Sequence, residues 1–101
     1  MIRHIVLWKF APSAAGKSRE QNLEEAASRL RALPSRIPDL REYQVYFGLL
    51  LGERSFDLVL VSSFESRHAL EAYQAHPSHQ EVATFLRTVQ TERAVVDFEL
   101  P

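Results

Sequence analysis

The sequence predicts an α+β domain in which a single antiparallel sheet of four strands carries two helices on one face. Four segments are rich in the β-branched and aromatic residues that favour strands. Two further segments repeat apolar residues at the three- and four-residue spacing of a helix. These segments follow one another as strand, helix, strand, strand, helix, strand over 101 residues, a length that fits one domain.

The first strand is expected over Ile2–Phe10, and a loop of small residues follows over 11–16. The first helix begins next, because Ser18 and Gln21 have the spacing of a capping box. Its apolar stripe is formed by Leu23, Ala26, Ala27, Leu30 and Leu33. Pro34 is expected to end this helix.

The second and third strands are expected over Leu40–Leu51 and Phe56–Phe64, with a turn over Gly52–Ser55 between them. Every second residue of the second strand is apolar, at Tyr43, Val45, Phe47, Leu49 and Leu51. Gly48 interrupts this strand and is a candidate for a β-bulge.

The second helix is expected in two parts, because Pro77 interrupts it. The first part covers Ser66–Ala75, and a second capping box from Ser78 to Glu81 starts the helix again. The apolar face of the restarted helix consists of Val82, Phe85, Leu86 and Val89. The last strand is expected over Glu92–Leu100. This order of elements is that of the split βαβ, ferredoxin-like arrangement.

Both faces of the predicted sheet are apolar. In the first strand, one face carries His4, Val6, Trp8 and Phe10, and the other carries Ile5 and Leu7. Leaving the second set in water forfeits roughly 1.5–3 kcal/mol for each large side chain. We therefore expect a homodimer, in which two sheets pack face to face into a barrel-like core. A monomer with an uncovered apolar face is the alternative.

Composition and charge limit the partners of this chain. With 12 basic and 13 acidic residues the net charge is −1, so no basic excess is available for nucleic acid. The chain has no cysteine, which excludes disulfides and thiolate metal sites and agrees with a cytoplasmic protein. Its apolar N-terminal run is too short to span a bilayer, so we expect no membrane partner.

The segment around Pro77 holds the most informative polar residues. Tyr73, His76 and His79 lie within seven residues of one another at the corner of the split helix. A neutral imidazole such as His79 can take a proton from a carbon beside a carbonyl, and the Tyr73 phenol can stabilise the resulting enolate. A ligand-contacting role and a purely structural role are the alternatives. No third ligand accompanies the two histidines, so we expect no metal.

Further ligand contacts are predicted at His4, Val6, Trp8, Phe85 and Arg93. His4 lies on an apolar strand face, where a satisfied core histidine is the alternative. Trp8 is either a pocket wall or part of the core. Arg93 is either an anion clamp or a charge that faces the sheet edge.

Four segments of the chain resemble a known family, and they are His4–Phe10, Phe56–Ser66, Ala72–His79 and Ala94–Glu99. On these segments the sequence is similar to the stress-responsive A/B barrel domains over nearly its whole length. The resemblance implies a dimeric α+β barrel with a cavity between the sheet and the helices of each subunit. Most relatives look like small cytoplasmic proteins without a defined biochemical role.

One plant member of that family closes a linear polyketide by aldol condensation without a cofactor. The resemblance places its catalytic tyrosine and histidine on Tyr73 and His79, and a cavity histidine on His4. Its substrate does not carry over, because other side chains, including Trp8 and Arg93, stand at the remaining cavity positions.

Three functions are compatible with these observations. The first is a homodimer with a small apolar ligand cavity, binding a small apolar or aromatic molecule. The second is a cofactor-independent cyclase or isomerase that acts on a polyketide-like or enolisable substrate. The third is a purely structural assembly module. The sequence favours the first of these.

Overall fold

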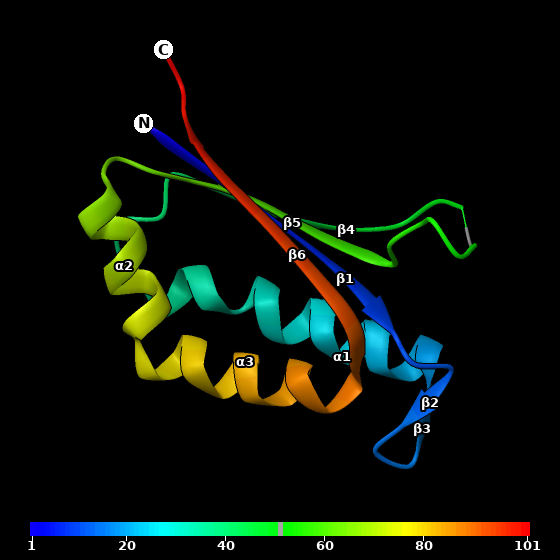
Figure 1. The fold of residues 1–101 in the computed structure, drawn as a ribbon. Coiled ribbons are helices and arrows are strands. Elements are labelled where there is room, and N and C mark those ends of the chain that lie inside the picture. The colour runs from blue at the N-terminus through cyan, green and yellow to red at the C-terminus, as the bar shows by residue number, and fades with distance from the viewer. Residues whose placement is uncertain (51) are drawn as a thin grey trace.

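The computed structural model describes residues 1–50 and 52–101, and it has the predicted α+β, ferredoxin-like architecture (Figure 1). Four antiparallel strands form one sheet, and the helices lie together below one of its faces. The strands occur in the order β4 (Glu42–Phe47), β5 (Leu58–Phe64), β1 (Ile2–Phe10) and β6 (Gln90–Glu99). The first and last strands of the chain are therefore neighbours, although the sequence separates them by the whole domain.

The helical layer consists of α1 (Arg19–Arg31), a short 3-10 turn η1 (Leu33–Ser35), α2 (Arg67–Ala75) and α3 (Pro77–Val89). The predicted capping box of α1 is confirmed, with both the Ser18 and the Gln21 hydrogen bonds present. The loop between β1 and α1 contains a small hairpin that the sequence analysis missed, formed by β2 (Ser13–Ala14) and β3 (Lys17–Ser18).

The predicted capping box at Ser78 is wrong, because α3 begins at Pro77, two residues before the start that an N-cap at Ser78 requires. His76 is the N-cap, and its Nδ1 accepts a hydrogen bond of 3.1 Å from the backbone N–H of Ser78. Proline fits the first helical position, since its fixed φ is helical and its missing N–H has no partner there. The split of the second helix is confirmed, and it places His76 at the corner.

The hairpin between β4 and β5 has shorter strands than predicted. Pairing ends at Phe47 and Leu58, and Leu49 beyond it is 93% exposed. Gly48 is not a bulge inside the strand but follows its last residue, where its N–H donates to the carbonyl of Asp57 at 2.8 Å. Leu51, the predicted end of the second strand, lies outside the described residues.

The two faces of the sheet differ in what covers them. The helix-facing side chains of β1 and β5 are buried against the helices. The opposite face carries apolar side chains that no helix of residues 1–50 and 52–101 covers, including Ile5, Leu7, Val59, Val61, Val96 and Phe98. The prediction that both faces are apolar is therefore confirmed. Within residues 1–50 and 52–101, no helix is long and apolar enough to cross a membrane.

Candidate functional site

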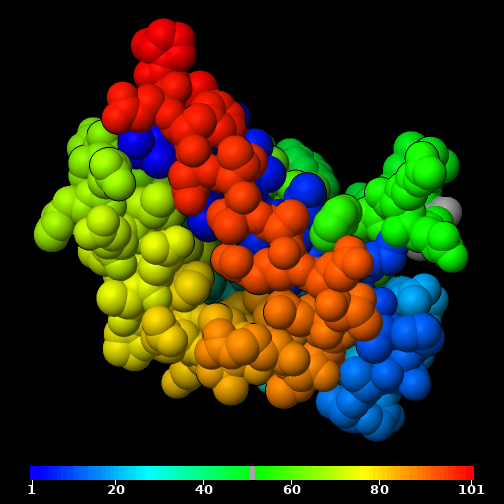
Figure 2. Space-filling view, viewed as in Figure 1, coloured from blue at the N-terminus to red at the C-terminus, as the bar shows by residue number. Residues whose placement is uncertain are grey.

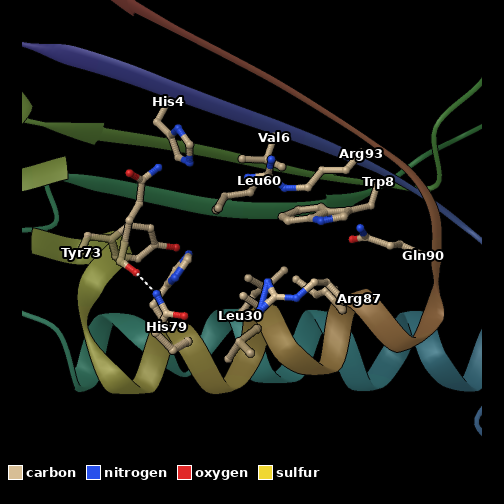
Figure 3. Close-up of a pocket in the computed structure, with 15 residues that line it drawn as sticks. His4, Val6, Trp8, Leu30, Leu60, Tyr73, His79, Arg87, Gln90 and Arg93 are labelled. Carbon is tan, nitrogen blue, oxygen red and sulfur yellow. Dashed lines mark hydrogen bonds between the residues drawn. The ribbon is translucent and has the colours of Figure 1, made fainter. Parts of the chain in front are cut away.

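A cavity of about 440 Å³ lies between the sheet and the helices. Side chains from β1, β5 and β6 line it on the sheet side, and side chains from α1, α2 and α3 line it on the helix side. Figure 2 shows a hollow in the surface between β6 and α3. The predicted cavity between sheet and helices is thus present, and Figure 3 shows its lining.

Three of the predicted residues meet at one end of this cavity. The rings of Tyr73, from α2, and His79, from α3, are 4.5 Å apart between centroids and meet edge to face. His4 points down from β1, and its ring lies 6.5 Å from that of Tyr73 (Figure 3). The corner between the two helices is held by a bond of 2.8 Å from the Gln80 amide to the carbonyl of Gln74. We call Tyr73, His79 and His4 the histidine end of the cavity.

His79 is the imidazole that is available to a ligand. Burial lowers the pKa of its ring below the usual value, while the nearby backbone carbonyl of Gln74 opposes this shift. The positive charges of Arg93 and Arg87 lower this pKa further. The ring is therefore neutral near pH 7, and its Nδ1 is buried without a hydrogen-bond partner among the described residues.

His4 has a fixed orientation because its Nδ1 pairs with the carboxylate of Asp97 on β6. The two residues are directly opposite each other in the β1–β6 ladder. A carboxylate accepts the hydrogen bond in such a pair, so Nδ1 carries a hydrogen and the ring orientation is fixed by Asp97. Asp97 was not predicted as a site residue.

The Tyr73 hydroxyl is buried and lies 3.1 Å from the hydroxyl of Tyr43, on β4. Burial raises the pKa of Tyr73 to about 12, although the Tyr43 hydrogen bond opposes the shift. Burial also raises the pKa of Tyr43, and Tyr73 adds to this. Both phenols are therefore protonated at neutral pH, and the pair can offer a hydrogen-bond donor but no base. Tyr43 is a further residue that the sequence analysis missed.

The opposite end of the cavity is positively charged. Arg87 from α3 and Arg93 from β6 line it together with Trp8 and Gln90, and we call these four residues the arginine end (Figure 3). Between the two ends lie apolar side chains, among them Val6, Leu30, Leu60, Val82 and Leu86. The cavity thus combines an apolar middle with polar groups at both ends, which is the usual make-up of a small-molecule site.

The sequence model of the stress responsive A/B barrel domain family matches residues 2–100. The chain belongs to this family. The resemblance found in the sequence is thereby confirmed over almost the full length. An uncharacterized protein of Streptomyces coelicolor is 29% identical over 99 residues, which cover 98% of this chain and 99% of that protein.

Solved structures with a similar fold include a protein of unknown function and an enzyme. A dimeric ferredoxin-like protein of unknown function from Thermobifida fusca has a TM-score of 0.82 and 27% identity, covering 98% of this chain and 90% of that one. A hydroxynitrile lyase from Passiflora edulis also has a TM-score of 0.82, with 16% identity, 99% coverage of this chain and 93% of that one. At 16% identity, the similarity to the hydroxynitrile lyase shows a common fold alone.

Two predicted ligand contacts of this A/B barrel domain lie away from the cavity. His76 caps α3 and lines a separate hollow beside α2. Phe85 packs towards α1, where the Arg29 guanidinium lies 4.2 Å from the centre of its ring. Val82 and Leu86 occupy the cavity-facing side of α3 in its place. His4, Val6, Trp8 and Arg93 all line the cavity as predicted, although their role in binding remains a prediction.

The sequence analysis missed further residues that line the cavity. For those on α3, the helical spacing from His79 could have predicted them. His79, Ala83, Leu86, Arg87 and Gln90 recur at three- and four-residue steps from the predicted His79. Extending the helical face from His79 therefore predicts Arg87 and Gln90 of the arginine end. Described residues 1–50 and 52–101 contain no cluster of three or more His, Asp or Glu side chains that is suited to a metal ion.

Proposed function

We propose that this A/B barrel protein is a homodimer in which each subunit binds a small, largely apolar molecule in the cavity. The cavity itself carries this proposal, because about 440 Å³ of space remains between well-packed layers. The cavity opens to solvent between β6 and α3, and a concave pocket of this volume, with an apolar middle and polar groups at both ends, is the usual form of a small-molecule site. The cavity therefore favours a binding role over a purely structural module.

The uncovered sheet face supports the homodimer. Val96 and Phe98 are partly exposed there, next to Ile5, Leu7 and Val61 on the neighbouring strands. A contiguous apolar surface on a sheet is typical of an interface between subunits. The similar protein from Thermobifida fusca is described as dimeric.

Binding is tested with the neutral apolar dye N-phenyl-1-naphthylamine. Its own fluorescence rises in an apolar site, and energy transfer from Trp8, the single tryptophan, reports its arrival in the cavity. We expect saturable binding of one dye per chain. Ala83→Phe fills the cavity from α3 and is expected to abolish it, whereas Ala75→Phe, at an exposed position outside the cavity, leaves it unchanged. Equal binding by Ala83→Phe and the wild type would refute a cavity site.

A second function, cofactor-independent proton transfer, is favoured by the histidine end. An imidazole nitrogen of His79 takes a proton from a carbon beside a carbonyl, and the electron pair moves onto the carbonyl oxygen as an enolate. Tyr73 donates its hydroxyl hydrogen to that oxygen while accepting one from Tyr43. The imidazolium then returns the proton to carbon, so the step balances without a further reactant. The hydroxynitrile lyase shows that the fold accommodates an enzyme.

Proton transfer is tested by deuterium incorporation into a panel of β-diketones in heavy water, followed by NMR. General bases contribute about 10²- to 10⁴-fold to such steps, so His79→Ala is expected to lose at least about 100-fold in exchange rate. His76→Ala is the matched control, since His76 lies outside the cavity and its loss only weakens the cap of α3. Equal exchange rates for His79→Ala and the wild type would remove His79 as the base.

A further inference from the structure

The same order of side-chain types occurs along the sheet wall and along the helix wall of the cavity. On the sheet, His4 lies at one end, Val6 in the middle, and Trp8, paired with Arg93, at the other. On the helix, α3 presents His79, then Val82 and Leu86, then Arg87. Both walls therefore run from an imidazole through apolar groups to a guanidinium (Figure 3).

The spacings on the two walls agree. Four residues of strand from His4 to Trp8 span about 13 Å. Eight residues of helix from His79 to Arg87 span about 12 Å. The imidazoles thus face each other at one end and the guanidinium groups at the other. A single elongated ligand can reach both ends at once.

The charge of the cavity differs in sign from that of the chain. The chain carries a net charge of −1, yet the lining holds Arg87 and Arg93 and no aspartate or glutamate. The ion pairs found among residues 1–50 and 52–101 involve neither arginine. Figure 3 shows both side chains extending from their backbones towards the middle of the cavity, Arg93 from the sheet side and Arg87 from the helix side.

From this arrangement we propose that the ligand is an organic anion with an apolar body. Its acidic group, a carboxylate, sulfonate or phosphate, lies between Arg87 and Arg93, and its apolar body passes Trp8 and Val6 towards His79. Guanidinium groups bind such oxyanions through paired, charge-assisted hydrogen bonds. Trp8 supplies an apolar wall beside the charged group (Figure 3). This inference rests on the proposed binding function and adds the chemical class of the ligand.

The test compares two dyes with the same aromatic skeleton. 1-Anilinonaphthalene-8-sulfonate carries one negative charge, and N-phenyl-1-naphthylamine carries none. An ion pair at a partly exposed site strengthens binding about fivefold, so two arginines favour the sulfonate by about 25-fold. We expect the wild type to bind the anionic dye more tightly by this factor, and we expect 0.5 M NaCl to reduce the preference.

Variants of the two arginines test whether these side chains cause the preference for the anionic dye. Arg87→Gln and Arg93→Gln are each expected to weaken the anionic dye about fivefold and to leave the neutral dye unchanged. Arg87→Lys and Arg93→Lys, which keep the charge, are expected to retain most of the affinity. Arg36→Gln removes an exposed arginine outside the cavity and is expected to change neither dye.

The outcomes separate this inference from the function on which it rests. Equal affinity of the wild type for both dyes, or an anionic affinity unchanged in the double Arg87→Gln/Arg93→Gln variant, overturns the inference alone. Anionic binding that survives Ala83→Phe places the anion outside the cavity and also overturns it. Absence of binding by both dyes overturns the proposed function and the inference together.

Discussion

Two neighbouring valines on β6 allow a direct test of the sheet-to-sheet dimer. Val96 lies on the uncovered face of the sheet and is 53% exposed, whereas Val95 lies on the helix-facing side and is 47% exposed. The two residues have the same side chain, nearly equal exposure and adjacent positions. Val96→Asp and Val95→Asp therefore differ mainly in the face that receives the carboxylate.

The expected effect on the dimer is large. Full burial of a valine stabilises by roughly 1.5–3 kcal/mol, so burying the half of Val96 that is exposed is worth about 1 kcal/mol in each subunit. A carboxylate at the same place costs several kcal/mol of desolvation in each subunit as well. Since a symmetric dimer counts each term twice, Val96→Asp is expected to raise the dissociation constant by at least about 10⁴-fold.

Sedimentation equilibrium of the two variants measures this effect. The wild type and Val95→Asp are expected to sediment at twice 11.6 kDa at micromolar concentration, and Val96→Asp at 11.6 kDa. Circular dichroism checks that each variant is folded. A Val96→Asp dimer as tight as the wild type, or dissociation caused by Val95→Asp alone, would show that the chain does not dimerise through this face.

Three smaller predictions concern stability. Gly48→Ala places a Cβ 2.2 Å from a backbone carbonyl oxygen and is expected to cost about 1–3 kcal/mol in urea unfolding, unlike Gly52→Ala, which meets nothing within 4 Å. Because burial lowers the pKa of His79, the folded state binds fewer protons than the unfolded state. Stability is therefore expected to fall as the pH drops through about 6.5, and His79→Gln reduces that slope. Tyr73→Phe removes the hydroxyl bond to Tyr43 and is expected to lower the melting temperature through a loss of about 1 kcal/mol.

The fold is predictable from the sequence because its strands and helices have strong local signals. The strand Ile2–Phe10 alternates buried and partly buried residues over its whole length, as its composition predicts. The β4–β5 hairpin is less predictable, because Leu49 continues the apolar alternation beyond Phe47, where the pairing with β5 has ended. The apolar alternation predicts a longer strand than the pairing with β5 allows, and the pairing decides where the strand ends.

The candidate site was predictable only in part, for a different reason. Tyr73 and His79 are close in sequence, so the corner at Pro77 brings them together. Asp97 and Tyr43 reach the site through strand pairing, and His4 and Asp97 are 93 positions apart in the sequence. Such partners depend on register, which a single sequence specifies only through the completed sheet.

The strand β6 joins the cavity to the proposed dimer interface. Arg93 lines the cavity and Asp97 pairs with the cavity residue His4, and Val96 and Phe98 alternate with them on the opposite face. A partner sheet that packs on Val96 and Phe98 therefore also holds Arg93 in place and, through Asp97, His4. Since linkage between binding equilibria is reciprocal, a cavity ligand is expected to tighten the dimer as much as the dimer tightens ligand binding.

This coupling is measured with the monomeric Val96→Asp variant and the neutral dye. We expect the folded monomer to bind N-phenyl-1-naphthylamine about fivefold or more weakly than the wild type, because coupling energies of this kind are typically about 1–3 kcal/mol. Ala75→Phe, at an exposed position outside both the cavity and the sheet, is expected to remain dimeric and serves as the control. A folded Val96→Asp monomer with wild-type affinity for the dye would show that β6 holds its cavity residues without help from the partner sheet.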